Sequence, residues 1–255
     1  MYITCNTMKI QYLSDLHIEL MGEYDFHLLC TKISPKCDTL VLAGDIGNPF
    51  YQNYKRFLHL MSDYFKKVFV ITGNHEYYKN DMVKADNKVS EICNSRSNLS
   101  FLNNTTELYN GYRFIGTTLW THISDPQYLI NDFSAIKDMN VNRYNNLHQK
   151  SRLFLKDSID NTSKNGENVV VITHHLPLHE LTHEKYKFGF MARYNQCFSA
   201  DFSDIIDKPN TIKSWFFGHT HTKTERIISN IPFYCNPLGY DGENNEPDIN
   251  CVVDV

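Results

Sequence analysis

The sequence lacks three features that would each indicate a class of function. It has no basic excess: 25 Lys and Arg stand against 29 Asp and Glu, for a formal net charge of -4. Such a chain has no overall positive field to collect nucleic acid, so an anionic substrate needs local positive charge. It has no long apolar run either, since stretches such as residues 169–172 are far too short to span a bilayer. We therefore expect no membrane partner.

Paired cysteines are also missing. The seven cysteines are scattered, and no two have C-x-x-C spacing. This disfavours a thiolate zinc site or a redox pair and favours small buried side chains in a reducing compartment. Residues 1–7 lack the basic and apolar segments of a secretory signal, and we interpret them as a short N-terminal extension. We expect a single domain over residues 8–255 in a soluble, cytoplasmic protein.

Short apolar runs alternate with longer segments of helical spacing. The runs are near-continuous, which is typical of strands covered on both faces, and they predict strands at 10–13, 39–43, 68–72, 169–173 and 215–217. Helices are predicted over residues 51–66, 79–96, 146–164 and 199–207. Asn110-Gly111 and Ser229-Asn230 predict hairpin turns, and 251–255 a last strand. Residues 120–145 and 177–198 are expected to be long, functional loops.

Polar side chains follow directly after all five predicted strands. The clusters are Asp15 and His17, Asp45 and Asn48, Asn74 and His75, His174 and His175, and His219 and His221. One such cluster means little, because a histidine after a strand is usually a hydrogen-bonded structural residue. Five clusters in one chain are hard to explain by chance, and ligands of open α/β sheets bind at the carboxyl ends of strands.

These side chains are suitable ligands for metal ions. Carboxylate, imidazole and amide groups suit Mn, Fe, Zn or Ni better than Mg or Ca. One carboxylate, that of Asp45, can bridge two ions about 3.5–4 Å apart. Two divalent ions bring four positive charges, and Asp15, Asp45 and one hydroxide remove three of them. The remaining charge of roughly +1 would attract a phosphate ester. Bound ions also lower the pKa of water toward neutrality, so no side-chain base is needed.

The motifs D-x-H, G-D, G-N-H-E, H and G-H-x-H occur in this order from Asp15 to His221. This pattern resembles the calcineurin-like metallophosphoesterase superfamily. The resemblance implies an α/β fold, a four-layer α/β/β/α sandwich of two mixed sheets flanked by helices. It also implies hydrolysis of a small phosphate mono- or diester by a hydroxide that bridges two divalent ions.

The resemblance further implies a role for each residue. One ion is held by Asp15, His17 and His221. The second is held by Asn74, His219 and one of His174 and His175, and Asp45 bridges the two. We favour His174 as the ligand because it comes first after the strand, and we expect His175 and Asn48 to support the ligands or to serve as alternative ligands. His75 is implied as the general acid that protonates the leaving group.

The residues after Asp45 set this chain apart from the protein phosphatases of the superfamily. Those enzymes carry an Asp that orients the catalytic histidine, and an Arg after it, whereas this chain has Asn48 and no following Arg. A neutral amide raises the pKa of a histidine less than a carboxylate does. We therefore expect small phosphodiesters to be cleaved at least as well as monoesters, and phosphoproteins hardly at all. Residues 116–120 and 235–240 resemble a small bacterial-type branch.

Three alternatives compete with this interpretation. Residues 179–183 match the zinc-protease motif H-E-x-x-H, but they begin two residues after Pro177 in an irregular stretch. A nuclease is disfavoured by the acidic balance and by a basic patch limited to Lys185, Lys187 and Arg193. A non-catalytic scaffold is disfavoured because every ligand position is filled. Of the other histidines, His148 is expected to open a helix and is a secondary site candidate only.

Overall fold

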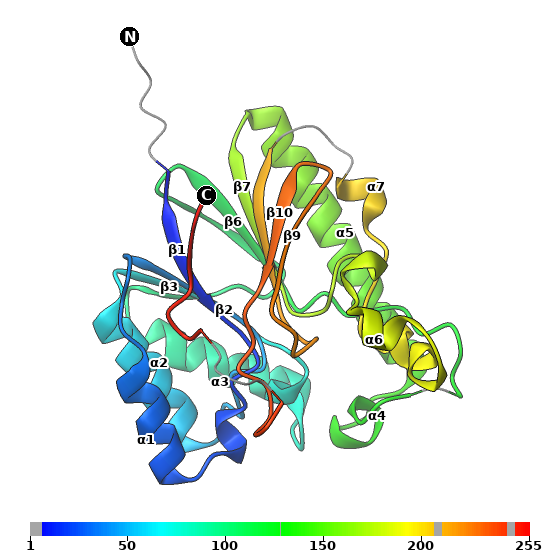
Figure 1. Cartoon of the computed structure of the whole chain (residues 1–255), viewed down its shortest axis with the longest axis horizontal. Helices are drawn as coiled ribbons and strands as arrows, with labels where there is room; N and C mark the ends of the chain where they lie inside the picture. Colours follow the sequence, from blue (N-terminus) through cyan, green and yellow to red (C-terminus); the bar gives the residue numbers. More distant parts are fainter. Residues whose placement is uncertain (1–6, 128, 207–210, 244–247) are drawn as a thin grey trace.

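The computed structural model describes residues 7–127, 129–206, 211–243 and 248–255. Two mixed sheets pack face to face, and helices cover the outer face of each (Figure 1). This four-layer α/β/β/α arrangement is the predicted fold class. Of the predicted N-terminal extension, residues 1–6 lie outside the described residues.

The first sheet has the strand order β11-β1-β2-β3-β4, and only β11 is antiparallel to its neighbour. Its strands are β1 (Lys9–Leu13), β2 (Thr39–Ala43), β3 (Lys67–Ile71), β4 (Leu99–Phe101) and β11 (Val252–Asp254). The helices on its outer face are α1 (Glu23–Lys32), α2 (Gln52–Tyr64) and α3 (Met82–Asn94) (Figure 1).

The second sheet has the order β5-β6-β7-β8-β10-β9, with parallel pairs in the centre and an antiparallel pair at each edge. Its strands are β5 (Thr105–Tyr109), β6 (Tyr112–Thr117), β7 (Asn168–Thr173), β8 (Ile212–Phe217), β9 (Thr224–Ile228) and β10 (Ile231–Cys235). The helices α5 (Val141–Asn165) and α7 (Ser203–Ile206) lie outside it (Figure 1). The connections hold η1 (Ile18–Leu20), η2 (His75–Tyr77), α4 (Asp132–Ala135), η3 (His179–Leu181), α6 (Glu184–Lys187) and η4 (Phe190–Cys197).

The continuous apolar runs are explained by burial on both faces of each sheet. In β2, Leu40 and Leu42 pack under the helices, while Val41 and Ala43 face the second sheet. The strands β3, β7 and β8 alternate in the same way between an outer core and the core between the sheets. Because side chains of a strand alternate in direction, a strand covered on both sides needs apolar residues at every position.

Several predicted boundaries are wrong. The helix predicted over 146–164 begins at Val141, because the Asn140 side chain accepts a hydrogen bond from the Arg143 N–H and caps it; His148 therefore does not open the helix. Residue 207 of the helix predicted over 199–207 lies outside the described residues, and of 199–206 only α7 is helical, since the Ala200 N–H donates to the Leu176 carbonyl oxygen instead. The helix α1 and the three-residue strand β4 were not predicted.

Both hairpins and the last strand are confirmed. The six cysteines that the structure describes form no disulfide with one another, and four of them are buried. Within the described ranges, no helix combines the length and apolar character needed to cross a membrane.

Candidate metal centre

The predicted ligands meet at one edge of the fold, where five strands end. Glycines bring the loops after these strands close together. A Cβ atom at Gly44 would lie 2.5 Å from Nδ1 of His174, and one at Gly73 would lie 2.1 Å from Oδ1 of Asp45. Each loop therefore needs glycine where it passes a candidate ligand.

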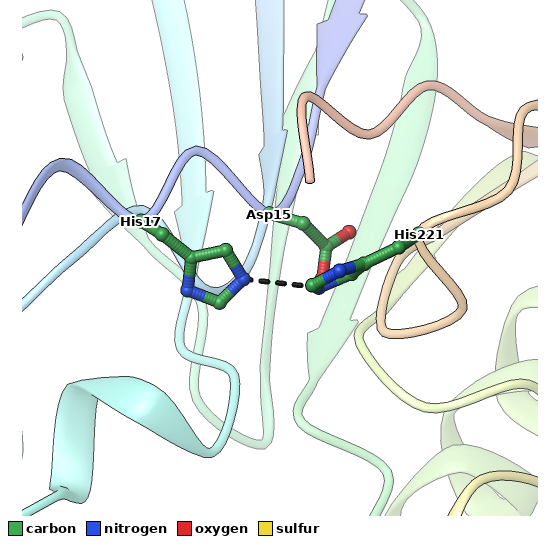
Figure 2. A group of neighbouring side chains, drawn as sticks. All are labelled: Asp15, His17 and His221. Atoms are coloured by element: carbon green, nitrogen blue, oxygen red, sulfur yellow. Dashed lines mark hydrogen bonds and ion pairs between the residues drawn. The ribbon is translucent and has the colours of Figure 1, made fainter. Parts of the chain in front are cut away.

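Asp15, His17 and His221 form the first group of candidate ligands, drawn from the ends of β1 and β8 (Figure 2). The Nε2 atoms of His17 and His221 lie 3.0 Å apart, and Nε2 of His221 is 3.5 Å from Oδ1 of Asp15. The backbone N–H of His219 donates to Asp15 and holds its carboxylate in place. One carboxylate and two imidazoles thus face a common point.

The second group is Asp45, His174 and His219, with Asn74 beside them. Nε2 of His174 lies 3.3 Å from Oδ2 of Asp45 and 3.1 Å from Oδ1 of Asn74. Its other ring nitrogen, Nδ1, donates to the carbonyl oxygen of Ala43. That bond leaves Nε2 as the atom directed at the group, which is how ligating histidines are usually oriented.

At several predicted ligands the backbone is in the left-handed conformation, which residues other than glycine usually avoid. Five of the predicted ligands have positive φ angles: Asp15 (52°), His17 (48°), Asp45 (53°), His219 (69°) and His221 (46°). Left-handed backbone at a non-glycine residue costs on the order of 1–3 kcal/mol and is concentrated at functional sites. The fold therefore holds these side chains inward at a cost in stability.

The charges and the unpaired atoms of the site fit divalent cations. Burial raises the pKa of Asp45, but the charges of His174 and His75 outweigh burial and hold it well below its usual range. Burial and the neighbouring His175 and His174 keep the pKa of His219 well below its usual value. Nε2 of His219 is buried and has no hydrogen-bond partner among the described residues. A cation beside the ionised Asp45 would satisfy that nitrogen.

His75 is held between a carboxylate and a phenol. Its Nδ1 donates to Oε1 of Glu19 at 3.0 Å, and its Nε2 lies 3.1 Å from the hydroxyl of Tyr240. The ring stacks on Tyr78 with centroids 4.1 Å apart. Burial lowers the pKa of His75, but the Asp45 charge and the Glu19 bond outweigh burial and raise it above the ordinary value. A histidine that retains its proton is suited to act as a general acid.

The Glu19 contact corrects the inference drawn from Asn48. We expected the amide at that position to leave His75 without a carboxylate partner, yet Glu19 supplies one. The Asn48 side chain instead accepts from the Phe50 N–H and donates to the Tyr78 carbonyl oxygen. Glu19 was missed; the only signal in the sequence is its place two residues after His17.

Asp132, which was also missed, orients Asn74. This carboxylate is completely buried in α4, and its Oδ1 accepts hydrogen bonds from Nδ2 of Asn74 (2.8 Å) and the Tyr78 hydroxyl (2.7 Å). With its Nδ2 bound to Asp132, Asn74 turns its Oδ1 toward His174. No motif marks Asp132, because it lies in a stretch predicted only as an irregular loop.

We expect Asp132→Ala to weaken metal binding about 10–100-fold, the usual effect of removing a partner that orients a ligand. Asp132→Asn keeps an acceptor and should lose less. Competition with a fluorescent chelator measures the affinity, and Asp157→Ala on the exposed face of α5 is the control. Equal affinity in the Asp132→Ala and control variants would contradict the orienting role.

The remaining predicted candidates lie outside the ligand groups. His175 is buried, and its Nδ1 bonds to the Thr118 carbonyl oxygen, but it belongs to neither ligand group, whereas His174 lies with Asp45 and His219. The H-E-x-x-H stretch does not form one helix: η3 ends at Leu181, and His183 caps α6. His148 bonds to the Trp120 carbonyl oxygen.

The family model for calcineurin-like phosphoesterases matches residues 8–223, which is most of the chain. The chain belongs to this family. Calcineurin-like phosphoesterases are hydrolases of phosphoesters that typically bind divalent metals, and the two ligand groups described above are able to hold such ions.

Two curated proteins are similar in sequence to this calcineurin-like phosphoesterase. An uncharacterized protein of Acanthamoeba polyphaga mimivirus is 29% identical over 278 residues, with 96% of each chain covered. A probable cyclic nucleotide phosphodiesterase of Coxiella burnetii is 22% identical over 247 residues, with 90% of this chain and 84% of that protein covered.

Solved structures share the fold of this calcineurin-like phosphoesterase. The phosphopantetheinyl hydrolase of Mycobacterium tuberculosis matches with a TM-score of 0.75 at 15% identity, over 98% of this chain and 96% of that one. A dimetal phosphatase from Danio rerio matches with a TM-score of 0.55 at 10% identity, over 91% and 87% of the two chains. At these identities the likeness extends to the fold alone.

Proposed function

We propose that this protein hydrolyses small phosphate mono- or diesters with two divalent transition-metal ions, such as Mn, Fe, Zn or Ni. The observation that carries the proposal is the position of Asp45 between the two ligand groups. Oδ2 of Asp45 lies 4.0 Å from Nε2 of His17 and 3.3 Å from Nε2 of His174. One carboxylate oxygen thus reaches both groups, which supports a bridging role.

The side chains divide the work between them. Asp15, His17 and His221 would hold one ion, and Asn74, His174 and His219 would hold the other. The ions, when bound, lower the pKa of water and neutralise charge on the phosphate. His75 carries a proton at Nε2 for the leaving oxygen, and Glu19 fixes the tautomer and the direction of its ring. The buried thiols of Cys30, Cys93 and Cys235 support the predicted intracellular location.

Metal content tests the proposal directly. We expect close to two transition-metal ions per chain after reconstitution, measured by elemental analysis on protein freed of loosely bound metal. Treatment with a chelator should remove activity on bis-nitrophenyl phosphate, and returning the metal should restore it. Full turnover by protein without bound metal would overturn the mechanism.

A further inference from the structure

A cavity of about 540 Å³ opens beside the candidate ligands and has two unlike halves. The ligands Asp45, Asn74, His219 and His221, together with His75, line the first half. The second half is lined by apolar and aromatic side chains from α6, η4, the residue after η4 and the segment before α4: Leu129, Ile130, Tyr186, Phe190, Met191, Tyr194 and Phe198. The halves are continuous, since the rings of Phe198 and His219 lie 4.7 Å apart.

Lysine and arginine are missing from the described lining of this cavity. None of the described residues that line it is a lysine or an arginine, whereas Glu243 adds a carboxyl group. Two nearby cations lie against aromatic rings: the Arg193 guanidinium is 5.4 Å from the Phe190 ring centroid, and the Lys185 ammonium is 4.6 Å from that of Tyr186. The positive charge along the described lining is then confined to the first half, where the metal ions and the protonated His75 would meet a single phosphate.

We propose that the apolar half binds the uncharged, aromatic organic group of a phosphodiester whose phosphate sits at the metal ions. This inference rests on the proposed function and names its substrate class. Phe190, Met191 and Tyr194 are the specificity-determining residues. Phe190 and Met191 are 64% and 49% exposed, so covering them with an apolar group removes further apolar surface from water. A second anionic group in the apolar half would find no cation among the described side chains that line it.

Two diesters that share the same leaving group test the contact between the organic group and the apolar half. Methyl 4-nitrophenyl phosphate and phenyl 4-nitrophenyl phosphate carry the same charge and differ only in the group that remains on phosphorus. Hydrolysis consumes one water: the P–O bond to nitrophenol breaks, a P–O bond to the water oxygen forms, and a monoester remains. We expect kcat/KM for the phenyl ester to exceed that for the methyl ester by at least about tenfold.

A charged analogue separates apolar recognition from anion recognition. The 4-carboxyphenyl ester has nearly the same shape as the phenyl ester but adds a negative charge. It should be cleaved less efficiently than the phenyl ester. A preference for the 4-carboxyphenyl ester, or equal kcat/KM for methyl and phenyl esters, would overturn the inference.

Variants locate the contact. Phe190→Ala and Tyr194→Ala should each lower the phenyl-to-methyl ratio of kcat/KM severalfold. The control is Phe188→Ala. Phe188 lies two residues before Phe190, is 77% exposed and is not part of the lining, so its substitution should leave the ratio unchanged. A ratio that changes equally in all three variants would contradict the assignment.

Binding separates this inference from the proposed function. If metal-loaded protein cleaves none of these diesters, the proposed activity on them fails. Calorimetric binding of diphenyl and dimethyl phosphate to the same protein then tests the cavity alone. Tighter binding of diphenyl phosphate by about tenfold supports apolar recognition, and equal binding overturns it.

Discussion

Asp45→Asn should remove metal from both ligand groups and lower kcat/KM at least about 10³-fold, or about 4 kcal/mol of transition-state stabilisation. The side chain is buried, its pKa is held well below the usual range, and one oxygen reaches both groups. Asparagine keeps the shape and can still accept the His75 N–H bond at Oδ1. It removes the negative charge and replaces Oδ2, the oxygen that reaches both groups, with an amide nitrogen that cannot bridge two cations.

Asp15→Asn is the matched control for this variant. Asp15 is equally buried, but it belongs only to the first group. Elemental analysis should therefore find close to one ion per chain in Asp15→Asn and less than one in Asp45→Asn, with circular dichroism confirming that both fold. Two ions bound to Asp45→Asn would contradict the bridging role.

The central strands were predictable because burial on both faces leaves a strong signal. All five residues of β2 are buried and only Thr39, at its start, is polar, so its run of apolar residues stands out. The helix α1 buries only Phe26, Leu29 and Cys30, too narrow a stripe to mark it clearly. Strand β4 has only 3 residues, too few for an alternation of apolar and polar residues to be recognised in the sequence.

The candidate ligands were predictable for a related reason. Parallel strands bring their carboxyl ends to one edge, so residues distant in sequence are placed together once the strands are known. The residues that support the ligands follow no such rule. Asp132 is 58 positions from Asn74, and Tyr240 is 165 positions from His75. These contacts depend on how irregular connections fold back over the sheet edge, which one sequence does not encode in any local pattern.

The same supporting contacts determine what the general acid should do. We expect His75→Ala to reduce kcat on alkyl phosphodiesters by about 10²–10⁴-fold, the typical contribution of a general acid. An alkoxide is a poor leaving group and needs a proton as the P–O bond breaks. Nitrophenolate leaves as a stable anion, so nitrophenyl esters should lose much less. The measurement compares kcat of wild type and variant on both substrates, with the same metal and pH.

Glu19→Gln gives this prediction a graded control. Glutamine can still accept a hydrogen bond from Nδ1 of His75, but it removes the charge that helps the ring retain its proton. The variant should therefore show the same unequal loss, larger on alkyl than on nitrophenyl esters, at a smaller size than His75→Ala. Equal losses on both substrates in His75→Ala would instead mean that His75 positions the phosphate. In that case the proton for the leaving oxygen has to come from elsewhere, and the hydroxyl of Tyr240, 3.1 Å from Nε2 of His75, is the nearest donor to test by Tyr240→Phe.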